Sequence, residues 1–128
     1  MSYTINRAFA GADFADIDAR TRKALADKGF GVLTEIDVQT VMKKKLDADL
    51  PGYRILGACN PQMAHQAILL EPRVGAMLPC NVIIRETGDG VEVSAIDPAA
   101  SMMAIDNAEL QAVAGQVGDM LSEAVAAI

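Results

Sequence analysis

A short glycine-containing turn near residue 90 constrains the fold of this chain more than any other segment. Gly88, Asp89 and Gly90 separate two runs with strand character, residues 81–87 and 91–96. Such a turn between two strand-like runs indicates a β-hairpin, whose strands are antiparallel. A doubly wound α/β fold, which is built on a mainly parallel sheet, is therefore only the second choice.

Two long amphipathic helices are expected to cover the sheet. The first spans about residues 13–28, with Asp13 as its N-cap and Gly29 after its end. The second begins with Asp106 as N-cap and Glu109 in a capping box. Its apolar residues follow helical spacing and are best explained as core: Leu110, Val113, Ala114, Val117, Leu121, Ala124, Val125 and Ile128.

Shorter elements fill the rest of the chain. Further strands are expected at about 3–9, 30–36 and 53–59, short helices at 38–47 and 61–70, a loop at 73–79, and a turn from Asp97 onward that is partly helical. The pattern predicts a single domain, residues 1–128, of the two-layer α+β class. Its sheet of about five mainly antiparallel strands would carry both long helices on one face.

Charge and composition exclude several classes of partner. The 128-residue chain has a formal net charge of −6, so nucleic acids and anionic membranes would repel it. Aromatic residues make up 4%, which argues against a surface that stacks bases. The start of the chain has no signal-peptide pattern and no apolar run is long enough to span a bilayer, so we expect a cytoplasmic protein with reduced thiols.

One block of the chain is unusually poor in charge. Within residues 53–84 only Arg54, Glu71 and Arg73 carry a formal charge. Such a block is either deep core or a covered surface, for example a subunit interface or a ligand cleft. Both cysteines and the only histidine lie inside it.

The same block carries a family resemblance. The pieces are Lys45-Leu46-Asp47, the run from Tyr53 to Pro61 (YRILGACNP), Ala64-His65, Leu78-Pro79-Cys80-Asn81-Val82, Asp97-Pro98 and Met102-Met103. Together they resemble the bacterial and archaeal family called domain of unknown function 302, over about residues 3–127. The resemblance implies a curved antiparallel sheet with two main helices on one face, similar to the TATA-box-binding-protein fold, and a homodimer. It implies no activity.

The two cysteines are the first candidates for chemistry. Cys59 ends a predicted strand just before the helix start at Asn60-Pro61, and Cys80 begins the next strand. If those strands are antiparallel neighbours, both thiols lie at one rim beside a helix N-terminus, a placement that lowers the pKa of a thiol. If the strands are parallel, the thiols lie at opposite ends.

Cys59, Cys80 and His65, with a methionine, would suit copper(I) or zinc, although the spacing matches no established zinc pattern. The alternative is that both cysteines are buried as small apolar residues and that His65 is an ordinary helix residue.

Other residues near the cysteines have both a structural and a functional interpretation. Asn60 and Asn81 each follow a cysteine, and either cap local structure or line a pocket and fix a polar ligand. Met102-Met103 are core filler or, alternatively, ligands of a soft metal or part of an adaptable binding surface. The run Lys43-Lys44-Lys45 is a solvated helix face or an anion contact.

Three hypotheses about function follow. The first is a homodimeric binding module that uses the charge-poor block for dimerisation and holds a small molecule or soft metal ion near Cys59, Asn60, His65, Cys80 and Asn81. The second is a thiol-based redox enzyme or sensor that uses the same cysteines. The third is a structural interaction subunit without a site. The sequence names no catalytic residue, reaction or cofactor.

Overall fold

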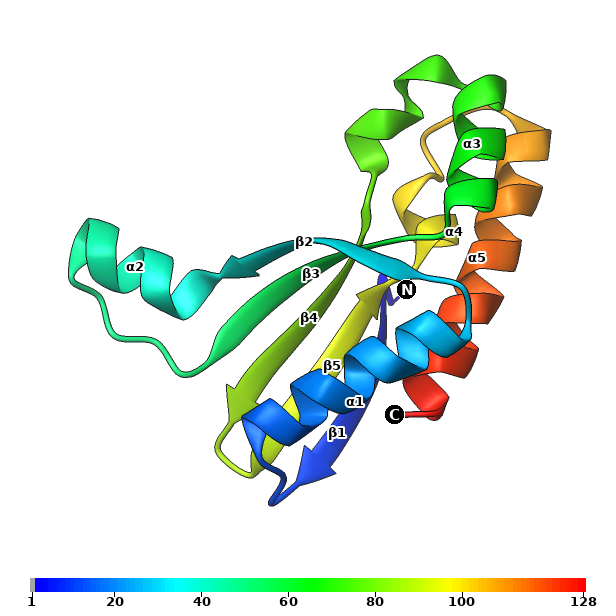
Figure 1. The fold of residues 1–128 in the computed structure, drawn as a ribbon. Helices are drawn as coiled ribbons and strands as arrows, with labels where there is room; N and C mark the ends of the chain where they lie inside the picture. The colour runs from blue at the N-terminus through cyan, green and yellow to red at the C-terminus, as the bar shows by residue number, and fades with distance from the viewer. Residues whose placement is uncertain (1) are drawn as a thin grey trace.

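The computed structural model describes residues 2–128, and its elements follow the order expected from the sequence (Figure 1). The strands are β1 (Thr4–Ala10), β2 (Gly31–Asp37), β3 (Tyr53–Cys59), β4 (Cys80–Thr87) and β5 (Gly90–Ile96). The helices are α1 (Phe14–Asp27), α2 (Val38–Leu46), α3 (Pro61–Leu70), the 3₁₀ helix η1 (Pro72–Met77), α4 (Pro98–Ser101) and α5 (Ala108–Ala126).

The five strands form one sheet in the order β1-β5-β4-β3-β2, and all neighbouring strands are antiparallel. β4 and β5 form the predicted hairpin, and Gly90, which was expected in the turn, begins β5 and pairs with Thr87. The α+β fold class with a five-stranded antiparallel sheet is therefore confirmed, and the doubly wound alternative is wrong.

The core lies between the sheet and the two long helices α1 and α5. Alternate residues of β3, β4 and β5 face these helices, among them Leu56, Val82 and Val93, each of which is fully buried. They pack against Ile17 of α1 and Leu121 of α5. Both long helices thus lie on one face of the sheet, as expected.

A charged network fixes α1 to the edge of the sheet. Asp18 accepts hydrogen bonds from Arg22 (2.7 Å) and from Arg54 of β3 (2.8 Å). Arg54 Nε also lies 3.1 Å from Glu35 Oε1, which gives charge attraction but not an aligned hydrogen bond. The Arg54 guanidinium packs over the Phe14 ring, with its carbon 5.1 Å from the ring centre.

Two local expectations are corrected. The expected loop at 73–79 begins instead as η1, whose N-cap Glu71 accepts a hydrogen bond from the backbone N–H of Arg73. The cap of the last helix is Asn107 rather than Asp106, because Asn107 Oδ1 accepts the N–H of Leu110 at 3.0 Å. Glu109 therefore lies one position too early for the expected capping box.

The segment β2–α2 ends in an arm, helix α2, that projects from the rest of the molecule (Figure 1). β2 is an edge strand, and none of the side chains of α2 is buried. Four apolar side chains of this segment and the loop after it are exposed: Leu33, Ile36, Leu46 and Leu50. Across residues 2–128, no helix combines the length and apolar character needed to cross a membrane.

Candidate functional site

Antiparallel pairing of β3 and β4 brings the two cysteines together. Ala58 is the register partner of Cys80, so Cys59 lies one residue diagonally from Cys80 at the same end of the sheet. The condition set by the sequence is met, since the end of β3 lies beside the start of β4.

The chain then turns into α3 at this rim. Asn60 Oδ1 caps the helix by accepting the N–H of Met63 at 3.1 Å, and Pro61 occupies its first turn. The loop after α1 closes beneath the cap. Gly29 there has a φ of +84°, and a Cβ on it would lie 3.1 Å from Asn60 Nδ2. A residue with a side chain would be strained at Gly29 and would crowd the amide of Asn60.

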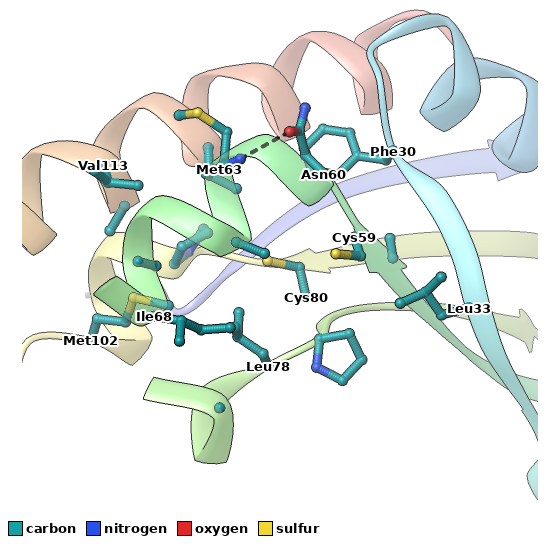
Figure 2. A pocket seen from close by; sticks show the side chains of 18 of the residues that line it. Phe30, Leu33, Cys59, Asn60, Met63, Ile68, Leu78, Cys80, Met102 and Val113 are labelled. Atoms are coloured by element: carbon teal, nitrogen blue, oxygen red, sulfur yellow. Dashed lines mark hydrogen bonds between the residues drawn. The ribbon is translucent and has the colours of Figure 1, made fainter. Parts of the chain in front are cut away.

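Above this rim lies a cavity of about 350 Å³, enclosed by β2, β3, β4, α3, η1, the α4 turn and α5. Figure 2 shows the side chains converging on it. Its lining comprises Phe30, Leu33, Thr34, Ala58, Cys59, Asn60, Met63, Ala64, Ala67, Ile68, Gly75, Leu78, Pro79, Cys80, Pro98, Met102, Leu110, Val113, Ala114 and Val117.

The lining is apolar apart from a few groups. Thr34, Asn60 and the two thiols are the polar side chains that line it, and no charged residue does. Leu33 is 68% exposed and Ile68 is 44% exposed, so they mark where the pocket meets solvent. The pocket is therefore an apolar chamber that opens to solvent, with polar groups contributed by β2, β3, β4 and the Asn60 cap.

The chemistry of Cys80 differs from the sequence expectation. Burial raises the pKa of the Cys80 thiol to about 11, and the nearby Cys59 adds to the rise. The prediction of a lowered thiol pKa at this rim is therefore wrong for Cys80. Desolvation outweighs the helix N-terminus here because the thiol lies 7% exposed among apolar neighbours.

The structure brings together three of the five predicted ligand-binding residues. Cys59, Asn60 and Cys80 line the pocket. His65 is exposed on α3 and Asn81 is exposed on β4, and neither lines the pocket. Within the described part of the chain, residues 2–128, no group of three or more His, Cys, Asp and Glu side chains gathers around a common point. The set of Cys59, Cys80 and His65 is thus not assembled.

Several lining residues were not singled out by the sequence. Val113, Ala114 and Val117 of α5 form the far wall, but their helical spacing indicated only core. Leu33 and Thr34 reach the pocket at an irregularity in the β2–β3 register between Val32 and Thr34. The charge-poor block was the one signal that pointed here, because it contains α3, η1 and both cysteines.

The basic run lies elsewhere. Lys43 of α2 contacts Asp47 at 2.9 Å and Asp49 at 3.1 Å, and Lys44 and Lys45 are exposed. Lys43 and Lys44 border a second hollow of about 410 Å³ beside α2. The pairing of Lys43 with carboxylates agrees with a solvated helix face.

Comparisons with known proteins place the chain in a family. No protein among the curated proteins matches it. A crystal structure of an uncharacterized conserved protein DUF302 from Bacillus stearothermophilus is similar, with a TM-score of 0.90, 20% identity and 98% of each chain covered. At this identity the likeness shows the fold alone. The family model described as "Domain of unknown function DUF302" matches residues 5–128, and the chain therefore belongs to the DUF302 family.

Proposed function

We propose that this chain is a cytoplasmic, homodimeric binding protein whose pocket takes a small, mainly apolar molecule. One observation carries the proposal: a cavity of about 350 Å³ that opens to solvent and is lined without any charged side chain. Well-packed cores contain few voids larger than a water molecule, so a chamber of this size is not a packing defect.

The size and chemistry of the cavity suggest the class of ligand. A cavity of roughly 150 Å³ lined by apolar residues is enough to bind benzene, and small-molecule pockets start near 300 Å³. The present cavity therefore has room for a bicyclic or tricyclic ring system or a short acyl chain. A single polar group on the ligand would face Asn60, whose amide lies at the rim beside Cys59 (Figure 2).

A thiol-based redox enzyme or sensor is the second candidate. The juxtaposition of Cys59 and Cys80 in one pocket favours it. The raised pKa of Cys80 disfavours it, because the thiolate is the nucleophile in thiol chemistry and a pKa of about 11 leaves Cys80 protonated at neutral pH. The binding role needs no ionised thiol.

The arm supports the homodimer. α2 has only nine residues, and its apolar side chains Val38, Val41 and Met42 are no more than partly buried. An isolated helix this short is marginal in water, and most helical stability comes from packing of an apolar face. A second copy covering the exposed Leu46 and Leu50 would supply that packing.

The ligand proposal is tested by fluorescence titration with 1-aminoanthracene, an apolar probe that brightens in dry sites. For a probe of this size we expect saturable binding with a dissociation constant of roughly 10–500 µM. Ala64→Leu fills the pocket and should abolish binding, whereas Gln66→Leu adds the same side chain on the exposed side of α3 and should not. Equal binding by both variants would contradict the proposal.

The dimer proposal is tested by sedimentation velocity. Wild-type protein should sediment as a dimer, and Leu46→Glu on the arm should give a monomer. Leu69→Glu, which places the same charge on the exposed side of α3, should leave the dimer intact. If the wild type is a monomer at all concentrations, the dimer is refuted. If only Leu69→Glu gives a monomer, the interface lies on α3 in the charge-poor block and not on the arm.

A further inference from the structure

The strand-end rim of the pocket carries two sulfur atoms and few other donors. Cys59 and Cys80 both line the cavity, and Figure 2 draws both side chains at it. We propose that this pair is a two-sulfur binding site for copper(I). The inference rests on the pocket of the proposed function. It adds a second kind of ligand, a metal ion bound by the two cysteines at the rim.

The backbone holds the Cα atoms of the two cysteines at a fixed spacing. Ala58 pairs with Cys80 across the β3–β4 ladder, and Cys59 follows Ala58 directly. Strand spacing and rise put the two Cα atoms roughly 6 Å apart. Cys59 is also paired with Gly31 of β2, and Cys80 begins β4, so both residues belong to the rigid sheet. Both cysteines are therefore anchored in the sheet, and an ion would reach their thiols in the cavity that both residues line.

The donors present select among metals. Zinc takes four ligands from cysteine, histidine and carboxylates, and no third ligand of these types joins the two thiols among residues 2–128. Hard cations need oxygen ligands, and the lining offers no carboxylate. Copper(I) is soft and prefers thiolate and thioether sulfur. Met63 and Met102 line the same cavity but lie apart from the two thiols, so the site is built on the cysteine pair (Figure 2).

The binding step exchanges protons for metal and moves no electrons between redox states. Each thiol gives its proton to solvent, and its sulfur lone pair forms the bond to copper(I). Two thiolates and one copper(I) ion leave one net negative charge. The N-terminus of α3 begins at Pro61, directly after Asn60, and its partial positive charge offsets that charge.

The test is an anaerobic titration of reduced, metal-free protein with copper(I) in competition with the chelator bicinchoninate. We expect one copper(I) per chain and release of about two protons per ion at pH 7. Cys59→Ser and Cys80→Ala should each weaken binding by more than roughly 100-fold, because loss of a ligand exceeds the effect of a residue that only supports one. His65→Ala is the matched control and should bind as the wild type does.

Cys59→Ser alone decides the matter if Cys80→Ala does not fold, since Cys59 is only half-buried. Failure of the wild type to compete with the chelator, or unchanged binding by Cys59→Ser, overturns the site. So does stoichiometric zinc binding through the same two thiols.

A parallel 1-aminoanthracene titration without metal separates the two proposals. Probe binding without copper binding overturns the metal site alone, and copper binding without probe binding overturns the apolar-ligand proposal alone.

Discussion

Cys80 is held in its protonated form by its surroundings. Burial raises the pKa of its thiol to about 11, so roughly one molecule in ten thousand carries the thiolate at pH 7. We predict that iodoacetamide modifies native Cys80 far more slowly than Cys59 at pH 7, and that denaturation removes the difference. Mass spectrometry of each cysteine peptide over time checks this. Rapid alkylation of native Cys80 would show that the pocket does not shield it.

The raised pKa of Cys80 also has a consequence for stability. The unfolded chain loses this proton at a lower pH than the folded chain does, so the contribution of the protonated thiol is complete below about pH 8.5. It is then lost as the pH rises toward 11. Cys80→Ala should flatten the decline in stability of the wild type over this range.

Asp18 behaves in the opposite sense. Burial alone would raise its pKa, but hydrogen bonds and charges from Arg22 and Arg54 outweigh burial and hold the pKa below its usual value of 3.8. Its contribution to stability is therefore present above pH 3.8 and is lost as the pH falls through the lower folded value. We predict that Asp18→Asn costs about 2 kcal/mol at pH 7 and weakens the acid dependence of unfolding.

Urea unfolding between pH 3 and pH 7 measures this dependence. Asp16→Asn is the control, because Asp16 and its partner Arg20 are both largely exposed and such pairs contribute under about 1 kcal/mol. An equal loss of unfolding free energy in both variants would mean that the network around Asp18 stabilises the fold no more than an exposed ion pair does.

The sequence predicted Asp13 as a cap and offered Asn60 as one, because a cap depends on a few neighbouring residues. It could not predict the partners of Asp18 or the pKa of Cys80. Both depend on residues that only the folded sheet brings near, such as Arg54, which lies 36 positions from Asp18.

Among the elements, α5 depends on one cap at its start. Asn107 accepts the N–H of Leu110 and donates to the carbonyl of Leu70, so it also ties α5 to the end of α3. We predict that Asn107→Ala lowers the free energy of unfolding by about 1–2 kcal/mol. Asp106→Ala, which removes the cap that the sequence favoured, should change it by less than about 0.5 kcal/mol. The reverse order in thermal unfolding would contradict the observed cap.

The wall of the pocket depends on a glycine in β3. A Cβ on Gly57 would collide with Thr34 Oγ1 and lie 2.7 Å from Pro79 Cγ, and both Thr34 and Pro79 line the cavity. We predict that Gly57→Ala costs about 1–3 kcal/mol and weakens 1-aminoanthracene binding. Gly75→Ala is the matched control, because Gly75 also lines the cavity but has open space around it. A Gly57→Ala variant as stable as wild type would show that this wall can yield.

The sequence predicted the long elements well and the irregular ones poorly. Periodicity over α1 and α5, and the Gly88-Asp89-Gly90 turn, are local signals that the fold preserves. η1 was expected to be loop because a 3₁₀ helix of six residues leaves almost no periodic pattern. The choice between Asp106 and Asn107 was ambiguous, since both residue types cap helices.

For the molecule as a whole, the pocket is a property of the assembled layers. The sequence placed Cys59, Asn60 and Cys80 at one rim, subject to the antiparallel pairing that the structure shows. It could not predict the chamber itself, because an apolar residue such as Val113 looks the same whether it fills a core or lines a cavity. The difference lies in how far α3 and α5 stand above the sheet, which no local pattern encodes.

For the whole molecule, the chamber is expected to admit an apolar ligand. A crystal structure of the protein grown with 1-aminoanthracene tests the claim most directly. We predict density for the rings between the thiols of Cys59 and Cys80 and the side chain of Val113, with the surrounding backbone unchanged. A chamber closed by collapse of α3 onto β3 and β4, with no probe inside, would contradict it.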